Sequence, residues 1–592
     1  MPRQKRKTPE KRSAPVNPAI TKSDVVATLA EMADIMEILG ENPFKSRAHQ
    51  TASRVIESLS GDLNEMVQSG ELLNVKGIGK GIFEKIEILL NTGVLPAYEE
   101  LKSRIPEDLL ELLRIPGMGP KKVKAVHEKL GVKNIGELEY ACAENRLVEL
   151  DGFGAKSQEK ILVGIQNLKK YMERHLLSTA LEEASLIYDE IAKHRDVQRH
   201  LLAGSLRRFK ETIKDIDILV SAKKSERIME HFTALHNVDS VVAKGKTKSS
   251  IVLDSGINAD LRVVADEQFP YASHYFTGNK EHNTQMRGRA KRMGMKLNEY
   301  GLFEGDTLIP CKDEEAIFKK LGLVYIPPEL REGTGEIEAA EQGELPELIR
   351  ESDIRGLFHV HSTYSDGIAT VGEMALAAKQ MGFEYLGIGD HSQSAAYAGG
   401  LSPSEVKKQR EEIDTLNESL EGFTVFHGIE SDILIDGSLD YPERILATFD
   451  YVVASVHSNF GLSEAQMTKR IIKAIENPYT TMLGHPTGRL LLAREAYKVD
   501  LIAVIEAASE HNVIIELNAH PQRLDLDWRY LKVAKEKGVK IAINPDSHNA
   551  AGLYDYRYGV GIARKGWLRR SDVINAMNTA EVRSLFQKMK KR

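Results

Sequence analysis

The sequence has few of the features that mark extracellular or membrane-embedded proteins. It contains only two cysteines in 592 residues, too few for a disulfide framework or a cysteine zinc site. No segment approaches the roughly 18 consecutive apolar residues of a membrane span, and the basic start, residues 1–12, does not resemble a secretory signal. With 42% hydrophobic residues, the length suits several globular domains of roughly 150 residues each. We therefore expect a multidomain protein of the cytoplasm, without a membrane partner.

The chain also lacks a strong excess of either charge. Its net charge is −6: residues 1–328 contribute +3 (50 basic, 47 acidic), residues 329–350 contribute −5 (2 and 7) and residues 351–592 contribute −4 (28 and 32). Small DNA-binding modules are usually far more basic. If this protein binds DNA, the positive charge must be local or backbone amides must make the contacts. The basic, proline-containing residues 1–19 predict a disordered tail.

One glycine pattern occurs three times in residues 20–170, which have the apolar spacing of helices. Each copy has a short apolar run, then Gly-apolar-Gly, then a helical pattern with an early lysine. The glycines let a ligand approach the backbone, and the following helix offers free N–H groups that suit a phosphate. The copies resemble helix-hairpin-helix units, which bind DNA backbones; for any single copy, a packing turn is the alternative. The glycine pairs are Gly77/Gly79, Gly117/Gly119 and Gly152/Gly154.

The remaining sequence divides into two α and β regions. Strand-like runs at 215–222, 249–256 and 259–266 place a mixed domain within residues 171–326. An acidic segment with proline and glycine, 327–350, marks a domain boundary. Beyond it, seven strand-like runs alternate with helical patterns, which predicts a parallel sheet closed, or nearly closed, into a barrel.

Three aspartates predict a two-metal site for phosphoryl transfer. Asp215 and Asp217 lie two apart in a strand, so both carboxylates project from one face and suit a hard cation such as Mg²⁺. Asp260 lies in another strand, where a solvent-facing position is the alternative. Two ions would activate an attacking 3′-hydroxyl and hold the leaving pyrophosphate. The groups expected at the triphosphate are Gly204, Ser205 and Arg208.

This region resembles the palm of family X DNA polymerases, such as polymerase beta. The resemblance rests on Gly-Ser before Asp-x-Asp, the later aspartate, and the segments YFTG at 275–278, MR at 286–287 and LNEY at 297–300. It implies that Asp215 and Asp217 bind both ions, magnesium or manganese, and that Asp260 binds the catalytic ion and the primer hydroxyl. It also implies contacts with the dNTP, the nascent base pair and the template by Tyr275, Phe276, Gly278, Asn283 and Arg287.

The same family carries a lyase activity in its N-terminal helical domain, based on a lysine Schiff base. Alignment through the first Gly-x-Gly places Lys85 at the position of that lysine and Lys45 at a 5′-phosphate contact. A lysine beside a phosphate-binding hairpin is placed to attack an abasic aldehyde. The alternatives for Lys85 are a solvated helix lysine or a plain phosphate contact.

Histidine and carboxylate residues gather at the ends of the C-terminal strand-like runs. Six of the nine histidines in residues 351–592 lie there. The strand ends of a βα barrel open on one side, so ligands that are distant in sequence converge, and His, Asp and Glu without cysteine suit zinc, manganese or iron. The candidate ligands are His359, His361, Asp366, His391, Glu430, His457, His485, Asp546 and His548.

The order of these ligands resembles the polymerase and histidinol phosphatase (PHP) domain, a distorted seven-stranded barrel. The resemblance implies up to three manganese, zinc or iron ions, bridging carboxylates that include Glu430, and metal-assisted phosphoester hydrolysis. Asp390 is interpreted as orienting a neighbouring ligand. Arg489 and Arg523 are candidates for holding substrate phosphate, with a structural role as the alternative.

Both resemblances cover nearly all of residues 20–592, in the order of the bacterial PolX type of repair polymerase. That type implies gap filling and 3′→5′ exonuclease activity, with 3′-phosphatase and abasic-site endonuclease as further options. Its substrates would be dNTPs and gapped, nicked or primed DNA, and we expect a monomer. The alternatives are a phosphoesterase with a secondary polymerase site and a DNA-binding scaffold. The expected domains are a tail (1–19), two helical domains (20–95, 96–170), a palm (171–265), a small α+β subdomain (266–326), a linker (327–350) and the barrel (351–592).

Overall fold

The computed structural model describes residues 20–590 except 60–62, 149 and 170–172. The tail expected at residues 1–19 therefore lies outside the described residues. The chain divides into two compact units. One contains Met1–Ile135 with Leu150–Gly152, and the other contains Gly136–Glu149 with Phe153–Arg592.

The described residues of the first unit form helices and turns, as the apolar periodicity predicts. Helix α1 begins at a capping box in which Thr21 and Asp24 exchange hydrogen bonds. Its apolar face packs with Ile82 and Ile86 of α4 in one core. The elements are α1 (Lys22–Ile38), α2 (Pro43–Ser58), α3 (Leu63–Gln68), η1 (Glu71–Asn74), α4 (Lys80–Thr92), α5 (Pro96–Lys102), η2 (Glu107–Arg114) and α6 (Pro120–Leu130).

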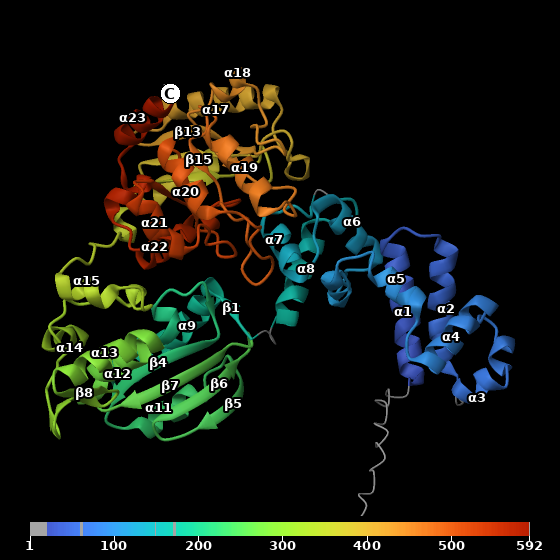
Figure 1. The fold of residues 1–592 in the computed structure, drawn as a ribbon, viewed down its shortest axis with the longest axis horizontal. Coiled ribbons are helices and arrows are strands. Elements are labelled where there is room, and N and C mark those ends of the chain that lie inside the picture. The colour runs from blue at the N-terminus through green and yellow to red at the C-terminus, as the bar shows by residue number, and fades with distance from the viewer. Residues whose placement is uncertain (1–19, 60–62, 149, 170–172, 591–592) are drawn as a thin grey trace, which may run out of the picture. The chain divides into compact units, whose positions relative to one another are not determined.

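The palm is a five-stranded sheet that follows two further helices, α7 (Ile135–Ala143) and α8 (Ala155–Lys169). Its order is β2-β4-β7-β6-β5, and only the β4–β7 pair is parallel. The predicted strands are confirmed (Figure 1). The elements are β1 (His175–Leu176), α9 (Leu177–Ala192), β2 (Val197–Leu202), α10 (Gly204–Arg207), β3 (Thr212–Ile213), β4 (Asp215–Ala222), α11 (Ser225–Phe232), β5 (Val238–Lys244), β6 (Lys248–Leu253) and β7 (Asn258–Val264).

A small α+β subdomain follows the palm and includes part of the acidic segment. Residues 327–350 connect to the barrel, but they also fold: Leu330, Ile337 and Leu348 join the apolar core of this subdomain. Charged groups there are paired, since buried Arg331 donates to Glu314 at 2.7 Å. The elements are α12 (Phe269–Thr277), α13 (Lys280–Arg292), β8 (Met295–Asn298), β9 (Gly301–Glu304), β10 (Thr307–Leu308), α14 (Glu314–Lys320), η4 (Pro328–Leu330) and α15 (Glu336–Gln342).

The C-terminal domain is the predicted barrel. All seven predicted strands form, in sequential order and all parallel. A bridge between Val360 and Ser547 brings the two ends of the sheet together. The strands are buried on both faces, which explains their continuous apolar runs. They are β11 (Gly356–Val360), β12 (Tyr385–Ile388), β13 (Thr424–Asp432), β14 (Tyr451–Ser455), β15 (Met482–Leu483), β16 (Ile514–Asn518) and β17 (Ile541–Asn544).

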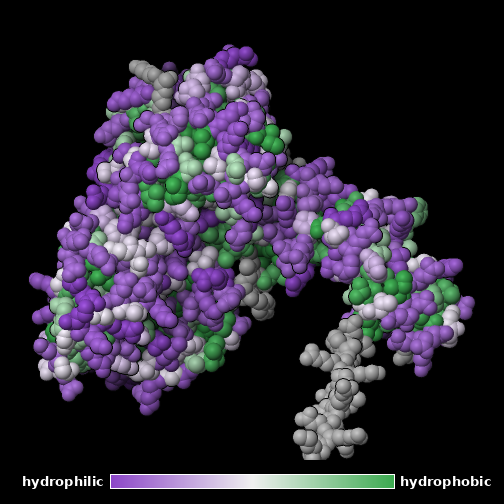
Figure 2. All heavy atoms as spheres, in the orientation of Figure 1, coloured by the Kyte–Doolittle hydropathy of each residue, from purple (hydrophilic) through white to green (hydrophobic). Residues whose placement is uncertain are grey.

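Helices surround the barrel strands, as Figure 1 shows in yellow to red. They are α16 (Val371–Gln380), α17 (Pro403–Ser419), α18 (Glu443–Leu446), α19 (Glu464–Ile475), α20 (Leu501–Glu510), α21 (Trp528–Glu536), α22 (Tyr556–Lys565) and α23 (Thr579–Met589). Hydrophilic side chains cover most of the visible surface (Figure 2). Among the described residues, no helix combines the length and the apolarity needed to cross a bilayer.

Candidate active sites and DNA-binding hairpins

The three predicted palm aspartates come together near the N-terminal ends of two adjacent strands inside the sheet, β4 and β7. Asp217 on β4 is paired in register with Asp260 on the neighbouring parallel strand β7, and Asp215 lies on the same face of β4. Burial, with the nearby Asp215 and Asp260, raises the pKa of Asp217 to about 6. Carboxylates that repel one another in this way form a site where a divalent cation would relieve the repulsion.

Asp215 and Asp217 open onto a pocket of about 380 Å³ that is lined by residues of α10, α12 and α13. Every residue that the family resemblance assigned to the dNTP or the nascent pair lines it. The lining consists of Gly204, Ser205, Arg208, Asp215, Asp217, Tyr275, Phe276, Thr277, Gly278, Asn279, Lys280, Asn283 and Arg287. Thr277, Asn279 and Lys280 were not predicted, although their place beside the YFTG segment was a local signal.

The pocket walls are fixed by contacts among the predicted residues. Asn283 donates to the carbonyl of Tyr275 at 2.7 Å, and the rings of Tyr275 and Phe276 pack edge to face at 5.2 Å. The guanidinium of Arg208 is held by Glu332 at 3.1 Å and by the carbonyl of Thr277 at 2.5 Å. Arg208 is therefore a buried residue of the pocket wall, and its side chain does not extend into solvent.

Two neighbours of Asp260 were missed by sequence reasoning. Lys248 lies 2.6 Å from one carboxylate oxygen, and the Ser250 hydroxyl donates to the other at 2.5 Å. Both residues belong to β6, which pairs with β7 only in the folded sheet. No local pattern around Asp260 could have indicated them.

The nine predicted barrel ligands converge in one cluster, with Glu430 at its centre. Glu430 Oε1 lies 3.2 Å from His359 Nε2, 3.2 Å from His457 Nε2 and 3.0 Å from His485 Nε2. Its Oε2 lies 2.9 Å from His391 Nδ1. A carboxylate with both oxygens between imidazoles from different strands has the position of a bridging ligand.

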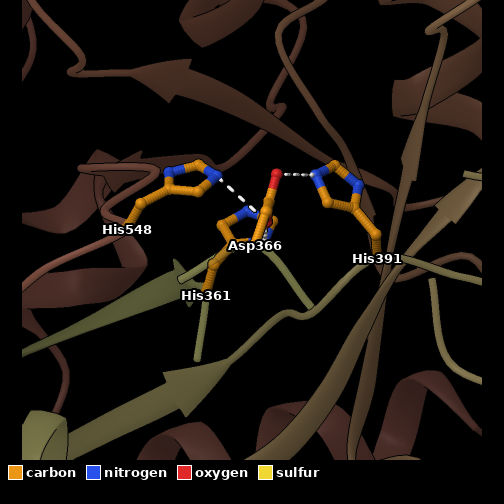
Figure 3. A group of neighbouring side chains, drawn as sticks. All are labelled: His361, Asp366, His391 and His548. Carbon is orange, nitrogen blue, oxygen red and sulfur yellow. Dashed lines mark ion pairs between the residues drawn. The ribbon is translucent and has the colours of Figure 1, made fainter. Parts of the chain in front are cut away.

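Two aspartates join the remaining histidines. Asp366 lies between His391 and His548, at 3.4 and 3.3 Å, with His361 close by (Figure 3). Asp546 Oδ1 lies 3.1 Å from His361 Nε2. The donor atoms form overlapping groups, each within 4.8 Å: His361, Asp366, His391 and His548; His359, His361 and Asp546; His391, Glu430 and His457.

Further carboxylates orient these ligands. His359 Nδ1 contacts Glu516 at 2.6 Å and His457 Nδ1 contacts Asp432 at 2.6 Å, which turns the opposite ring nitrogens toward Glu430. Asp390 binds the backbone and hydroxyl of Ser362, next to His361, at 2.7 and 2.6 Å. Asp390 thus holds the residue next to His361 rather than a ligand itself, and its orienting role stays a prediction. Asp432 follows Glu430 by two residues in its strand, a signal that sequence reasoning overlooked.

The chemistry of the cluster fits bound cations. Burial alone would lower the pKa of His359, but Glu516, Glu430 and Asp546 raise it well above its ordinary value. Burial, with His548 alongside, instead lowers the pKa of His361 to about 3. Within the described residues, several buried ring nitrogens have no hydrogen-bond partner, as expected of metal ligands: His359 Nε2, His361 Nδ1, His391 Nδ1 and Nε2, and His548 Nε2.

The three Gly-x-Gly turns have the geometry of phosphate-binding hairpins. The first glycine of each is left-handed, with φ of 105° at Gly77, 89° at Gly117 and 83° at Gly152. The second glycines, Gly79 and Gly119, are the N-caps of α4 and α6, and Gly154 directly precedes α8. Free helix N–H groups therefore follow each turn.

The charges of the predicted lyase lysine and of the predicted phosphate contact act on the same histidine. Lys85 donates to the carbonyl of Gly81 at 3.2 Å. Burial of His49, with the charges of Lys85 and Lys45 nearby, lowers the pKa of His49. Both lysines are thus within electrostatic reach of one buried imidazole.

Comparison with known proteins agrees with this architecture. The matching families are the DNA polymerase beta thumb (272–332), a helix-hairpin-helix domain (20–95), a SAM-like helix-hairpin-helix tandem (109–167) and the PHP domain (358–520). The PHP match ends before Asp546 and His548. The folded barrel nevertheless brings both residues into the ligand cluster.

Three relatives are informative. The DNA polymerase/3'-5' exonuclease PolX of Bacillus subtilis is 38% identical over 571 residues, 96% of this chain and 99% of that protein. A "probable phosphatase" of Thermoanaerobacter sp. (strain X514) is 31% identical over 229 residues, 37% of this chain and 88% of that protein. Another from Clostridium acetobutylicum is 32% identical over 207 residues, 32% of this chain and 77% of that protein.

Hairpins, palm, thumb and metal-ligating barrel in one chain define a polymerase-beta-like protein with a PHP domain. More narrowly, the chain belongs to the family of the Bacillus subtilis PolX protein, with which it aligns over nearly the full length of both.

Proposed function

We propose that this protein is a DNA polymerase that fills short gaps during DNA repair in the cytoplasm. Its PHP domain is proposed as a 3′→5′ exonuclease that prepares the primer end. The observation that carries the proposal is the presence of two complete sites in one chain: the palm aspartates beside a pocket of about 380 Å³, and the cluster of six histidines and three carboxylates in the barrel. The relative named DNA polymerase/3'-5' exonuclease supports both assignments.

At the palm, Asp215, Asp217 and Asp260 would hold two magnesium or manganese ions. When bound, such ions activate the primer hydroxyl and neutralise charge on the leaving pyrophosphate. Lys248 and Ser250 hold the carboxylate of Asp260, which would face the primer hydroxyl. Tyr275 and Phe276 form the wall expected at the sugar.

The opposite side of the pocket would receive the base pair and the triphosphate. Asn283 and Arg287 line the part of α13 assigned to the nascent pair and template. Gly204 and Ser205 bring the backbone and a hydroxyl to the phosphates, and Lys280 adds a cation there. The substrates are accordingly dNTPs and primed, nicked or gapped DNA.

In the barrel, the nine ligands would hold up to three manganese, zinc or iron ions. These ions supply polarisation of the phosphoester and of an attacking water. Glu430 and Asp366 lie between histidines of different strands, Asp546 lies beside His361, and these three carboxylates would hold the ions together with the histidines. Glu516 and Asp432 fix the orientation of His359 and His457. The same site would also serve a 3′-phosphatase or an abasic-site endonuclease.

The three hairpins would bind the DNA backbone without reading sequence, because their donors are backbone N–H groups. Lys45 would bind the 5′-phosphate of a gap, and Lys85 would attack an abasic aldehyde; the charges of both act on His49. We propose that the protein acts as a monomer.

A second candidate is a phosphoesterase acting on a small phosphate, favoured by the relatives named probable phosphatases. They align over only about a third of this chain, 37% and 32%. Hairpins and a palm would contribute nothing to a small substrate.

Separation-of-function variants test the proposal on a 5′-labelled primer across a short gap, with Mn²⁺. Asp217→Ala should abolish extension with dNTPs and keep shortening without them. His361→Ala should abolish shortening and keep extension. The matched controls are Asp239→Ala, an exposed aspartate of β5, and His511→Ala, a histidine outside the cluster. Extension that survives Asp217→Ala, or hydrolysis of histidinol phosphate but of no DNA end, would contradict the proposal.

A further inference from the structure

A turn from the helical part of the chain reaches the barrel metal cluster. It follows α7, in the segment Gly136–Glu149 that belongs to the same compact unit as the barrel. Glu144 on this turn is 1% exposed. Its carboxylate groups with Asp546 and His548, the donor atoms all lying within 4.8 Å of one another. Glu144 is therefore a tenth potential ligand that lies outside the PHP domain.

The turn is shaped to point two charged side chains at the cluster. Asn145, between them, has a φ of 55°, a left-handed conformation that few non-glycine residues adopt. Arg146 pairs with the Glu144 carboxylate, places Nε 3.5 Å from Asp366 and stacks over the Tyr397 ring at 4.7 Å. Glu144 thus lies near Asp546 and His548, and Arg146 lies near Asp366.

Helix α7 is held on the barrel by specific contacts. The Tyr140 hydroxyl accepts from Arg523 Nε at 2.9 Å, and Gln522 donates to Glu139 at 2.8 Å. At Gly136 the helix packs so closely on Ala493 that a Cβ would collide with it. Arg523 is 3% exposed and lies 3.6 Å from Asp546. Tyr140 therefore covers a cation beside the cluster.

We propose that Glu144 is an additional ligand of the barrel metal centre and that residues 136–146 form a cap that must lift before a DNA 3′ end can enter. The proposal rests on the exonuclease assignment made above. A glutamate carboxylate and a phosphate oxygen are both hard anionic ligands, so they compete for one coordination position. Lifting the cap would withdraw Glu144 from the ligand groups and would remove Tyr140 from Arg523. The Arg523 guanidinium would then be free to pair with a phosphodiester beside the cluster.

Locking the cap tests its gating role. Glu139→Cys and Gln522→Cys, whose native side chains are in contact, are joined by a reducible bismaleimide; Cys142 and Cys311 are buried. The joined protein should shorten a 5′-labelled primer at least tenfold more slowly than the same sample after reduction. Each single-cysteine variant, treated in the same way, serves as the control. Equal rates before and after reduction would overturn the gating role.

Metal binding tests the ligand role without any DNA. In calorimetric titration with Mn²⁺, Glu144→Gln should weaken one class of sites at least tenfold, and Glu159→Gln, an exposed glutamate of α8, should leave all sites unchanged. Unchanged Mn²⁺ affinity in Glu144→Gln would overturn the ligand role. Because this titration needs no nuclease activity, its outcome is separate from that of the exonuclease assignment: a protein that binds Mn²⁺ through Glu144 but digests no primer would contradict only the latter.

Discussion

At the scale of single residues, Gly204 is the most constrained position of the palm. Its φ is +62°, and a Cβ built there would collide with the carboxylate of Asp217. Both observations exclude a side chain, because the left-handed conformation is strained for other residues and the collision would displace the carboxylate of Asp217, a proposed metal ligand.

Gly204→Ala should therefore lower kcat/KM for dNTP incorporation by about 100-fold, the effect of misplacing a reacting group by roughly 1 Å. Exonuclease activity should not change. Gly305→Ala is the matched control, since Gly305 has a φ of +59° and no atom within 4 Å of the position that a Cβ would take. Single-nucleotide insertion kinetics measure the effect, and equal losses in the two variants would show that backbone strain, not Asp217, is responsible.

Residues with a local signature could be predicted from the sequence. Asp-x-Asp places two carboxylates on one strand face, and histidines at strand ends converge in any parallel barrel. Lys248, Glu516 and Glu144 could not be predicted, because strand pairing or the packing of a distant helix brings them to their sites. Their roles depend on tertiary neighbours that no spacing in the sequence specifies.

At the scale of elements, the hairpins are defined by their glycines and the barrel by its apolar runs. Both were predictable from the sequence. A left-handed turn favours glycine, and a strand that is buried on both faces has a continuous apolar run. The folding of the acidic segment 327–350 was not predictable, because its many charged residues are typical of a linker between domains. Arg331 and Glu336 are nonetheless buried there, paired with Glu314 and His282.

The second hairpin offers a direct test of backbone binding. Lys121 is exposed in the first turn of α6, and Lys129 is exposed in the last turn of the same helix. Lys121→Ala should weaken binding to gapped duplexes of any sequence and lower the slope of log affinity against log salt by about 1, because one phosphate contact is lost. Fluorescence anisotropy at several KCl concentrations measures this slope. If Lys129→Ala has the same effect, the helix binds DNA by general charge rather than through its N-terminus.

At the scale of the whole molecule, a lysine of the barrel reaches the polymerase pocket. Lys565 on α22 is 1% exposed, donates to the carbonyl of Arg208 at 3.0 Å and pairs with Glu332 at 2.5 Å. Glu332 also holds the pocket residues Arg208 and Asn279. The barrel therefore supports the dNTP pocket through one shared carboxylate.

Lys565→Met should raise KM for dNTPs by roughly 3- to 10-fold while the exonuclease rate stays unchanged, because Arg208 and Asn279 lose their fixed partner. Lys537→Met, at an exposed pair with Glu506 on the barrel, is the control. Steady-state kinetics of both activities measure the effect. A parallel loss of both activities would indicate general destabilisation instead of support for the pocket.

The central claim, that the two sites act in turn on one primer end, is tested most directly with a 5′-labelled primer that ends in a mismatch within a gap. In Mn²⁺ with all four dNTPs, the protein should remove the mismatched nucleotide and extend the primer, so that sequenced products carry the template-matched base. His361→Ala products should retain the mismatch. Wild-type products that retain the mismatch, from a primer that is never shortened without dNTPs, would contradict the account.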